Sequence, residues 1–226
     1  MKMLVDFVDL IGKNIEVEMS RDIFLRGTLL DSGLDIIVMY DEKDQHFLYI
    51  PLVHIQKLKE TSKDNEGFTY HPPSERPIET ELISFRKVLM IAKGLFVQVY
   101  VTGNKSIHGY LTSIMNDYFV FHSPVYKTMF IAMKHVKWLI PYPPNATPYS
   151  LNNENLPLKP ISIPLARSFD EQLKKFENQL VIIDGGENPD QIGLLQKVRN
   201  NKVALITAER EMVYLNIEHI KTIQLP

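Results

Sequence analysis

Three histidines recur at matched positions in this sequence, and histidine is the side chain that most often binds metals or transfers protons near neutral pH. His54, His135 and His219 each follow an aromatic, an aliphatic and a third apolar residue at the same spacing. A zinc site needs three or four ligands close together, and none of the three has a second His, Asp or Glu at a ligand spacing. The chain has no cysteine, which excludes disulfides, thiolate nucleophiles and cysteine-bound metals. We therefore predict no metal and no cofactor, and a structural role for each histidine at the turn before a strand, where an imidazole can hydrogen-bond free backbone groups.

The middle of the chain is basic and rich in aromatic residues, which is a composition that can bind nucleic acid. Residues 82–141 contain 7 lysines and arginines against 1 acid. Lysines contact phosphates and aromatic rings stack on bases, so this segment is a candidate site for single-stranded RNA. The candidate contacts are Lys105, Lys127, Lys134, Lys137, Tyr126 and Trp138.

The same segment can instead complement acidic parts of the protein. Residues 1–60 contain 7 basic and 11 acidic residues, and residues 168–226 contain 7 and 9. Aromatic residues at alternate strand positions are commonly core residues, and the lysines can pair with acids such as Glu209 and Glu211. We favour this second interpretation and keep RNA binding as the alternative.

Motifs of enzyme active sites are absent from the sequence. It contains no Gly-X-Ser-X-Gly, no phosphate-binding glycine loop and no His-Glu-X-X-His. The segment Asp184-Gly185-Gly186-Glu187 is better explained as a turn between strands than as a pair of catalytic carboxylates. We therefore expect no enzymatic activity and assign no catalytic residue.

These features belong to one pattern that occurs three times. A glycine opens a Gly-X-Leu step in each copy and precedes the matched histidine by 27, 26 and 26 residues; these glycines are Gly27, Gly109 and Gly193. Eight residues after each glycine stands a polar residue, and these are Asp35, Asp117 and Asn201. The glycines and histidines are therefore structural markers of a repeat.

Each repeat is predicted to form a short helix followed by about five antiparallel strands. Short apolar runs of period two, or fully apolar runs, alternate with turn residues throughout. The second repeat has a helical stretch at 84–94. In the third, a capping box from Ser168 to Glu171 leads into a helix with Phe169, Leu173 and Phe176 on one face. The predicted fold class is mainly β, with each repeat closing into a small barrel.

Two proline-containing segments separate the repeats. We predict barrels at 1–60, 82–141 and 168–226, joined by linkers at 61–81 and 142–167 that hold nine of the fourteen prolines. The second linker is unusually apolar between its prolines, and part of it should therefore pack against a barrel. Its apolar residues are Leu156, Leu158, Ile161, Ile163 and Leu165.

The second repeat resembles the Sm-like proteins, which include the bacterial Sm-like RNA chaperone. The stretch VQVYVTGNKSIHGYLTSIMNDYFVFH is similar to the first Sm motif, with its hairpin, its strand-two glycine and its acidic residue before strand three. Tyr49 to Ile55 is similar to a domain of unknown function from spore-forming bacteria that is linked to the spore coat. The resemblance covers about three quarters of the chain and implies three tandem Sm-like, SH3-type small barrels. The chaperone has a Tyr-Lys-His run where this chain has Phe130-Ile131-Ala132, so the basic pair of its RNA pocket is missing.

The resemblance implies a function based on protein contacts. Strands four and five of Sm-like barrels are edges that pair between barrels, and open edges favour association. We expect a structural or assembly protein that self-associates through strand edges, and in a specific version a component of the spore coat. The sequence has no apolar run long enough to span a membrane and no signal-peptide pattern. We expect a cytoplasmic protein, deposited on the spore if it is made in a sporulating cell.

Overall fold

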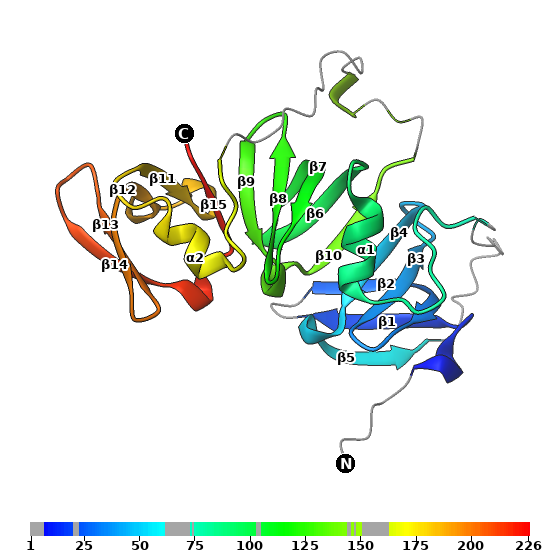
Figure 1. The fold of residues 1–226 in the computed structure, drawn as a ribbon. Coiled ribbons are helices and arrows are strands. Elements are labelled where there is room, and N and C mark those ends of the chain that lie inside the picture. The colour runs from blue at the N-terminus through cyan, green and yellow to red at the C-terminus, as the bar shows by residue number, and fades with distance from the viewer. Residues whose placement is uncertain are drawn as a thin grey trace. The chain divides into compact units, whose positions relative to one another are not determined.

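A computed structural model describes residues 7–19, 23–61, 73, 75–102, 105–143, 146, 148–150 and 163–226 (Figure 1). The fold is mainly β, as predicted: in these residues fifteen antiparallel strands and two α-helices are found. The chain divides into two compact units. One holds the described residues within Met1–Ala92, Val97–Val99 and Lys137–Pro144, and the other holds those within Lys93–Phe96, Tyr100–Val136 and Asn145–Pro226.

The elements follow the predicted order of a short helix and five strands, three times over. The first repeat has η1 (Val8–Leu10), β1 (Asn14–Met19), β2 (Ile23–Ser32), β3 (Ile36–Asp41), β4 (His46–Pro51), η2 (Leu52–His54) and β5 (Ile55–Glu60). The second has α1 (Phe85–Ala92), β6 (Phe96–Thr102), β7 (Lys105–Ile114), β8 (Tyr118–Ser123), β9 (Lys127–Ala132), η3 (Met133–His135) and β10 (Trp138–Pro141). After η4 (Pro148–Ser150), the third has α2 (Phe169–Lys174), β11 (Leu180–Ile183), η6 (Asp184–Gly186), η7 (Pro189–Gln191), β12 (Ile192–Arg199), β13 (Lys202–Ile206), β14 (Met212–Asn216), η8 (Ile217–His219) and β15 (Thr222–Gln224).

Strand pairing repeats in the same way. The order along the sheet is β14-β13-β12-β11-β15-β9-β8-β7-β6-β10-β4-β3-β2-β1-β5, so strands four and five are the edges of each set of five. The long second strand has a register shift at the same place in every repeat, between Leu29 and Asp31, between Leu111 and Ser113, and between Leu195 and Lys197. A bulge bends a strand and increases its twist, which a small curved sheet requires. Closure of each set into a separate barrel remains a prediction, as do the domain boundaries.

The repeated glycines are explained by close packing of strands two and three. A Cβ atom at Gly27 would lie 2.1 Å from the carbonyl oxygen of Tyr40. The same atom would lie 2.2 Å from the His122 oxygen at Gly109, and 2.4 Å from the Ile206 oxygen at Gly193. These contacts are with backbone atoms that cannot rotate away, so only glycine fits.

The predicted apolar face of α2 is confirmed, whereas its predicted cap is wrong. Phe169, Leu173 and Phe176 are buried in one core with residues of the second and third repeats. The Ser168 side chain makes no capping hydrogen bond. The Phe169 N–H donates instead to the Asp117 Oδ1 at 2.8 Å, because the preceding repeat brings a carboxylate to this helix start.

Part of the second linker packs as expected. Ile163 and Leu165 lie against the same core as α2. Leu156, Leu158 and Ile161 lie outside the described residues. In the first linker, Ile78 is buried, and most of the segment before it is likewise outside the described residues.

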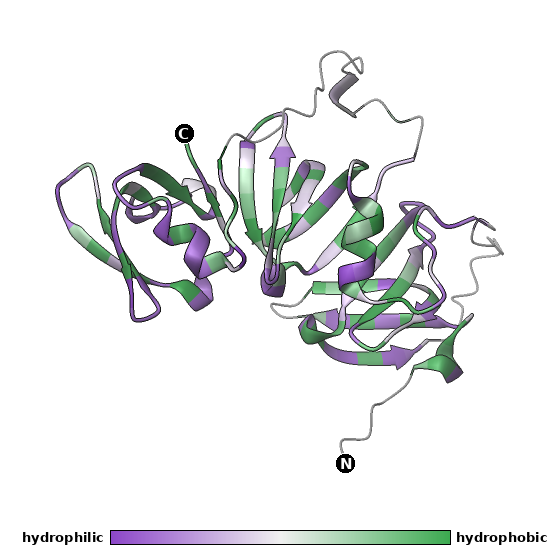
Figure 2. Ribbon diagram, viewed as in Figure 1, coloured by the Kyte–Doolittle hydropathy of each residue, from purple (hydrophilic) through white to green (hydrophobic). Residues whose placement is uncertain are grey.

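Figure 2 shows hydrophobic residues along β8 and β9 and mostly hydrophilic residues on β5. Within the parts of the chain that are described, no helix combines the length and the apolar character needed to cross a membrane.

Candidate protein-binding edge

Strand four of one repeat pairs with strand five of the next. In the first unit, β4 pairs antiparallel with β10, and Leu139 lies opposite Tyr49. In the second unit, β9 pairs antiparallel with β15, and Ile223 lies opposite Phe130. Tyr49 and Phe130 are equivalent positions of the sequence repeat, so the register is the same both times.

The aromatic residue of strand four is buried in the first repeat. Tyr49 is 0% exposed, and its hydroxyl donates to the Ile78 carbonyl at 2.9 Å while accepting from the Ile78 N–H at 3.1 Å. Burial raises the pKa of this hydroxyl to about 12. The segment that leads to α1 therefore anchors on β4, and it does so through backbone groups, which any residue except proline supplies at position 78.

The second repeat buries the same position. Phe130 is 0% exposed, and its ring centroid lies 5.0 Å from that of Phe176 in an edge-to-face contact. Tyr118, beside it, donates its hydroxyl to the Ala166 carbonyl at 2.8 Å, just before α2. Strand four of each of these repeats is thus covered by strand five and by the residues around the helix of the following repeat.

The third repeat leaves the position open. Tyr214 on β14 is 67% exposed, and Met212 on the same side of the strand is also exposed. One edge of β14 pairs with β13, with Ala204 opposite Tyr214. Among the described residues no strand pairs with the other edge. An uncovered edge that carries an exposed aromatic residue is a site for adding another strand.

The repeated polar residue after strand two also contacts the following repeat in the first two repeats but not in the third. The Asp35 Oδ1 accepts the N–H of Phe85 at 2.9 Å at the start of α1, as Asp117 does for Phe169 at the start of α2. A carboxylate at a helix N-terminus satisfies a free N–H and interacts favourably with the helix dipole. Asn201 has no following helix in the chain, and its Nδ2 donates to the Asn216 Oδ1 at 3.1 Å. Sequence reasoning identified these three positions as part of the repeat and missed the capping role of Asp35 and Asp117.

The repeated histidines end the short helices before strand five, as predicted. The His135 Nε2 lies 2.9 Å from the backbone oxygen of Glu218, in the next repeat. The neighbouring Lys134 forms an ion pair with the Glu218 carboxylate, and this hydrogen bond lowers the pKa of Glu218. His54 is half-buried and His219 is exposed. His135 therefore contributes to a contact between the second and third repeats, whereas His219 faces solvent.

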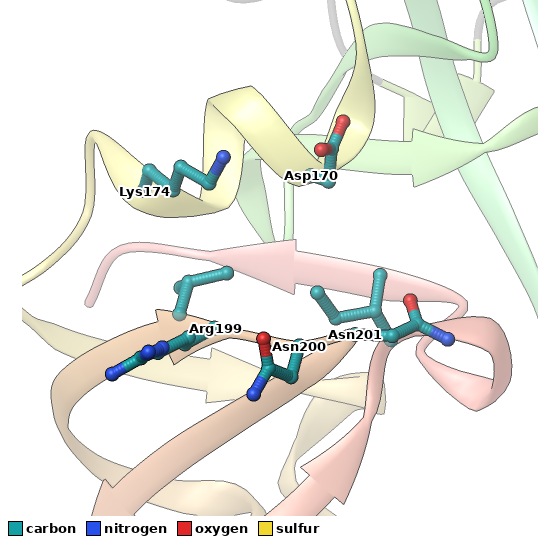
Figure 3. Close-up of a pocket in the computed structure, with 7 residues that line it drawn as sticks. Asp170, Lys174, Arg199, Asn200 and Asn201 are labelled. Atoms are coloured by element: carbon teal, nitrogen blue, oxygen red, sulfur yellow. The ribbon is translucent and has the colours of Figure 1, made fainter.

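A hollow of about 150 Å³ lies in the third repeat (Figure 3). It lies between α2, which supplies Asp170 and Lys174, and the β12–β13 turn at Asn200 and Asn201. The Asp170 pKa is lowered, chiefly by the Ser168 hydroxyl, and Lys174 is ion-paired with Glu171. The Asp170 carboxyl therefore does not have the raised pKa of a general acid.

The candidate RNA contacts differ in how far their side chains are exposed. Lys127 and Lys134 are exposed, and Lys134 is the residue paired with Glu218. Tyr126 is partly exposed, Lys137 is half-buried, and Trp138 is only 7% exposed, within β10. Lys105 begins β7, and its side chain lies outside the description. A buried indole cannot stack on a base, and RNA binding by this set stays a prediction.

In the described part of the chain, no three carboxylate or histidine side chains lie together in a way that could hold a metal ion. Asp184, in the segment predicted to be a turn, has a positive φ of 50°, as turn residues do. Its Oδ1 accepts the N–H groups of Lys221 at 2.8 Å and Thr222 at 2.9 Å, and burial raises its pKa. This carboxylate therefore holds the start of β15 in place.

Two proteins of Bacillus subtilis (strain 168) are similar to the chain. The uncharacterized protein YwrJ is 46% identical over 222 residues, a match that covers 96% of this chain and 97% of YwrJ. Spore coat protein B is 30% identical over 141 residues, which are 62% of this chain and 35% of that protein. A family model described as the YwrJ third domain matches residues 168–223.

Proposed function

The chain belongs to the YwrJ family, and from this membership and the open edge of β14 we propose that it is a non-enzymatic structural or assembly protein of the spore coat. It acts by binding protein along a strand edge. The observation that carries this proposal is the contrast between β4 and β9, whose outer edges are paired, and β14, whose outer edge is open.

The open edge has the composition of a protein contact. Tyr214 and Met212 are exposed on β14, and tyrosine and methionine are enriched in protein interfaces. An added strand satisfies the free backbone groups, and the aromatic residue adds apolar contact area. The chain itself forms this kind of contact at β4 and at β9, which supports the same chemistry at β14.

The Sm-like small barrel is the finer version of this architecture. It is supported by the sequence resemblance and by the strand order, which puts strands four and five at the edges of each set of five. The location in the spore coat is supported by the similarity to spore coat protein B. We propose that the protein is made in the cytoplasm of the sporulating cell and deposited on the spore.

A non-enzymatic role is supported by the way the polar side chains are used. The carboxylates of Asp35, Asp117 and Asp184 accept backbone N–H groups that position neighbouring elements. The polar side chains around the hollow are paired with side chains next to it or exposed. These side chains thus maintain the fold and the contacts between repeats.

The proposal is tested by following the tagged full chain in sporulating Bacillus subtilis. We expect the wild-type chain in the extracted coat fraction of purified spores. Tyr214→Lys, which places a charge on the open edge, should lower this amount by about tenfold or more, since interface aromatics often dominate binding. Val125→Lys is the control, because Val125 is comparably exposed but lies outside β14. Absence of the wild-type chain from the coat fraction, or equal loading of Tyr214→Lys, would contradict the proposal. Binding of a single-stranded RNA oligonucleotide with a log–log salt slope of roughly −0.7 per phosphate contact would favour the RNA alternative.

A further inference from the structure

The two ends of the strand order are complementary. At one end is β14, the fourth strand of its repeat, and at the other end is β5, the fifth strand of its repeat. Among the described residues, neither strand has a partner on its outer edge. The equivalent strands are paired on both sides: β9 with β8 and β15, and β15 with β11 and β9. Among the described residues there is therefore one unpaired outer edge of each kind.

Building on the proposed function, we propose that the partner at the β14 edge is the β5 edge of a second copy of this chain, in a head-to-tail contact. The first repeat meets the second through β4 and β10, and the second meets the third through β9 and β15. The third repeat meets the first repeat of the next copy in the same way. Because the two surfaces differ, the contact is heterologous and adds copies in one direction, to a ring or a filament.

The repeat predicts the register of this contact. Leu139 lies opposite Tyr49, and Ile223 lies opposite Phe130. Counting forward from the matched histidine by four residues gives Leu58 on β5 as the equivalent of Leu139 and Ile223. Leu58 of one copy therefore lies opposite Tyr214 of the other.

The neighbouring positions fit this register. Pairing Leu58 with Tyr214 puts Lys59 opposite Val213 and Lys57 opposite Leu215. Each of these lysines therefore faces an apolar residue of β14. Two acids, Glu209 and Glu211, come just before this strand. Lysine stems can cover apolar surface while their ammonium groups reach acids, as Lys59 does with Glu16 of its own chain at 2.6 Å.

The matched histidine provides a second contact. His135 lies 2.9 Å from the backbone oxygen of Glu218, the residue directly before the histidine of the next repeat. The exposed His219 therefore reaches the backbone oxygen of Val53 of the second copy, since Val53 stands directly before His54. Val53 is itself exposed.

The chain has no cysteine, which allows a direct test of the register. Two full-length variants are made, Leu58→Cys and Tyr214→Cys, and each is oxidised alone and in an equal mixture. We expect disulfide-linked dimers in the mixture and only background amounts with either variant alone. The control mixture pairs Leu58→Cys with Val125→Cys and should stay at the background level.

Self-association is then measured without cross-links by light scattering of the full chain over a range of concentrations. The average mass of the wild type should rise with concentration, and Tyr214→Lys should weaken the association by about tenfold or more. Val125→Lys should associate as the wild type does. Circular dichroism of each variant shows whether the fold is kept, and the exposure of Tyr214 predicts that it is.

Three results would overturn the proposal. Cross-linking of Tyr214→Cys with itself would mean a twofold contact between two β14 edges. A chain that stays monomeric at all concentrations would exclude a second copy as the partner. Cross-linking of the control mixture to the same extent would mean random collision. In the last two cases, loss of Tyr214→Lys from the spore coat would still support the proposed function with a different protein on β14, so the two proposals fail separately.

Discussion

β9 and β14 occupy the same place in consecutive repeats but have opposite surroundings. Phe130 on β9 is fully buried between the second and third repeats, whereas the equivalent Tyr214 on β14 faces solvent. Both strands pair on one side with strand three of their own repeat. Only β9 is followed by another repeat that supplies a strand five and a helix.

The comparison shows that burial is supplied here by the next repeat and not by the strand itself. Fully burying a side chain such as phenylalanine stabilises a protein by about 1.5–3 kcal/mol, and β14 lacks this contribution within the chain. Repeat proteins are stabilised by contacts between neighbouring repeats, and their terminal repeats require a cap or a partner. In the third repeat, no strand among the described residues pairs with the outer edge of β14.

The largest expected effect distinguishes the two aromatic positions. Phe130→Ala leaves a cavity beside Phe176 and Tyr118 and should lower the free energy of unfolding by about 3–5 kcal/mol. Tyr214→Ala should change it by less than about 0.5 kcal/mol, because the ring is already exposed. Urea unfolding at low protein concentration, where copies do not associate, measures both. Similar losses for the two variants would mean that Tyr214 is packed in the isolated chain.

A smaller effect is expected at the polar residue after strand two. Asp117→Ala removes the acceptor for the Phe169 N–H and should lower the free energy of unfolding by about 0.5–2 kcal/mol. Asn201→Gly should cost a few tenths of a kcal/mol, since Asn201 caps no helix in the chain. Glycine is used there because Asn201 has a positive φ of 58°. The same urea titration checks the pair, and an equal or larger loss at Asn201 would contradict the assigned roles.

The smallest effect concerns the ion pair between Lys134 and Glu218. The hydrogen bond from Lys134 lowers the pKa of Glu218, so the stabilisation is present above the ordinary glutamate pKa and is lost as the pH falls through the lowered value. Lys134→Ala should return this pKa towards its ordinary value, as an NMR titration can measure. Glu177 is an internal control, because its pKa is lowered chiefly by the N–H of Val198 and should not change. An unchanged Glu218 pKa in the variant would mean that the pair does not persist in solution.

Much of this fold could be predicted from the sequence. Gly27, Gly109 and Gly193 mark the places where strands two and three of each repeat lie too close together for a Cβ atom. The histidines mark the turns before strand five. Both signals are local, because each depends on a few residues and on atoms of one repeat. The apolar face of α2 was predictable for the same reason, since the periodicity of a helix depends on the residues of a single segment.

The candidate site could not be predicted in this way. Tyr49, Phe130 and Tyr214 are all aromatic residues in similar apolar stretches, and nothing in those stretches tells which of them is exposed. The contacts that bury Tyr49 and Phe130 join residues between 29 and 93 positions apart, such as Tyr49 with Ile78 and Phe130 with Ile223. The cap of α2 was missed for the same reason, since Asp117 precedes Phe169 by 52 residues.

The sequence by itself determined the repeat, the mainly β fold and the positions of the repeated glycines, because these depend on periodicity and spacing along the chain. The tertiary structure decided which edges are covered. Strand pairing is made by backbone groups that every residue except proline has in full, so the pairing of β4 with β10 and of β9 with β15 leaves little trace in residue types. The open edge of β14 became visible only when the other two strand-four edges were seen to be occupied.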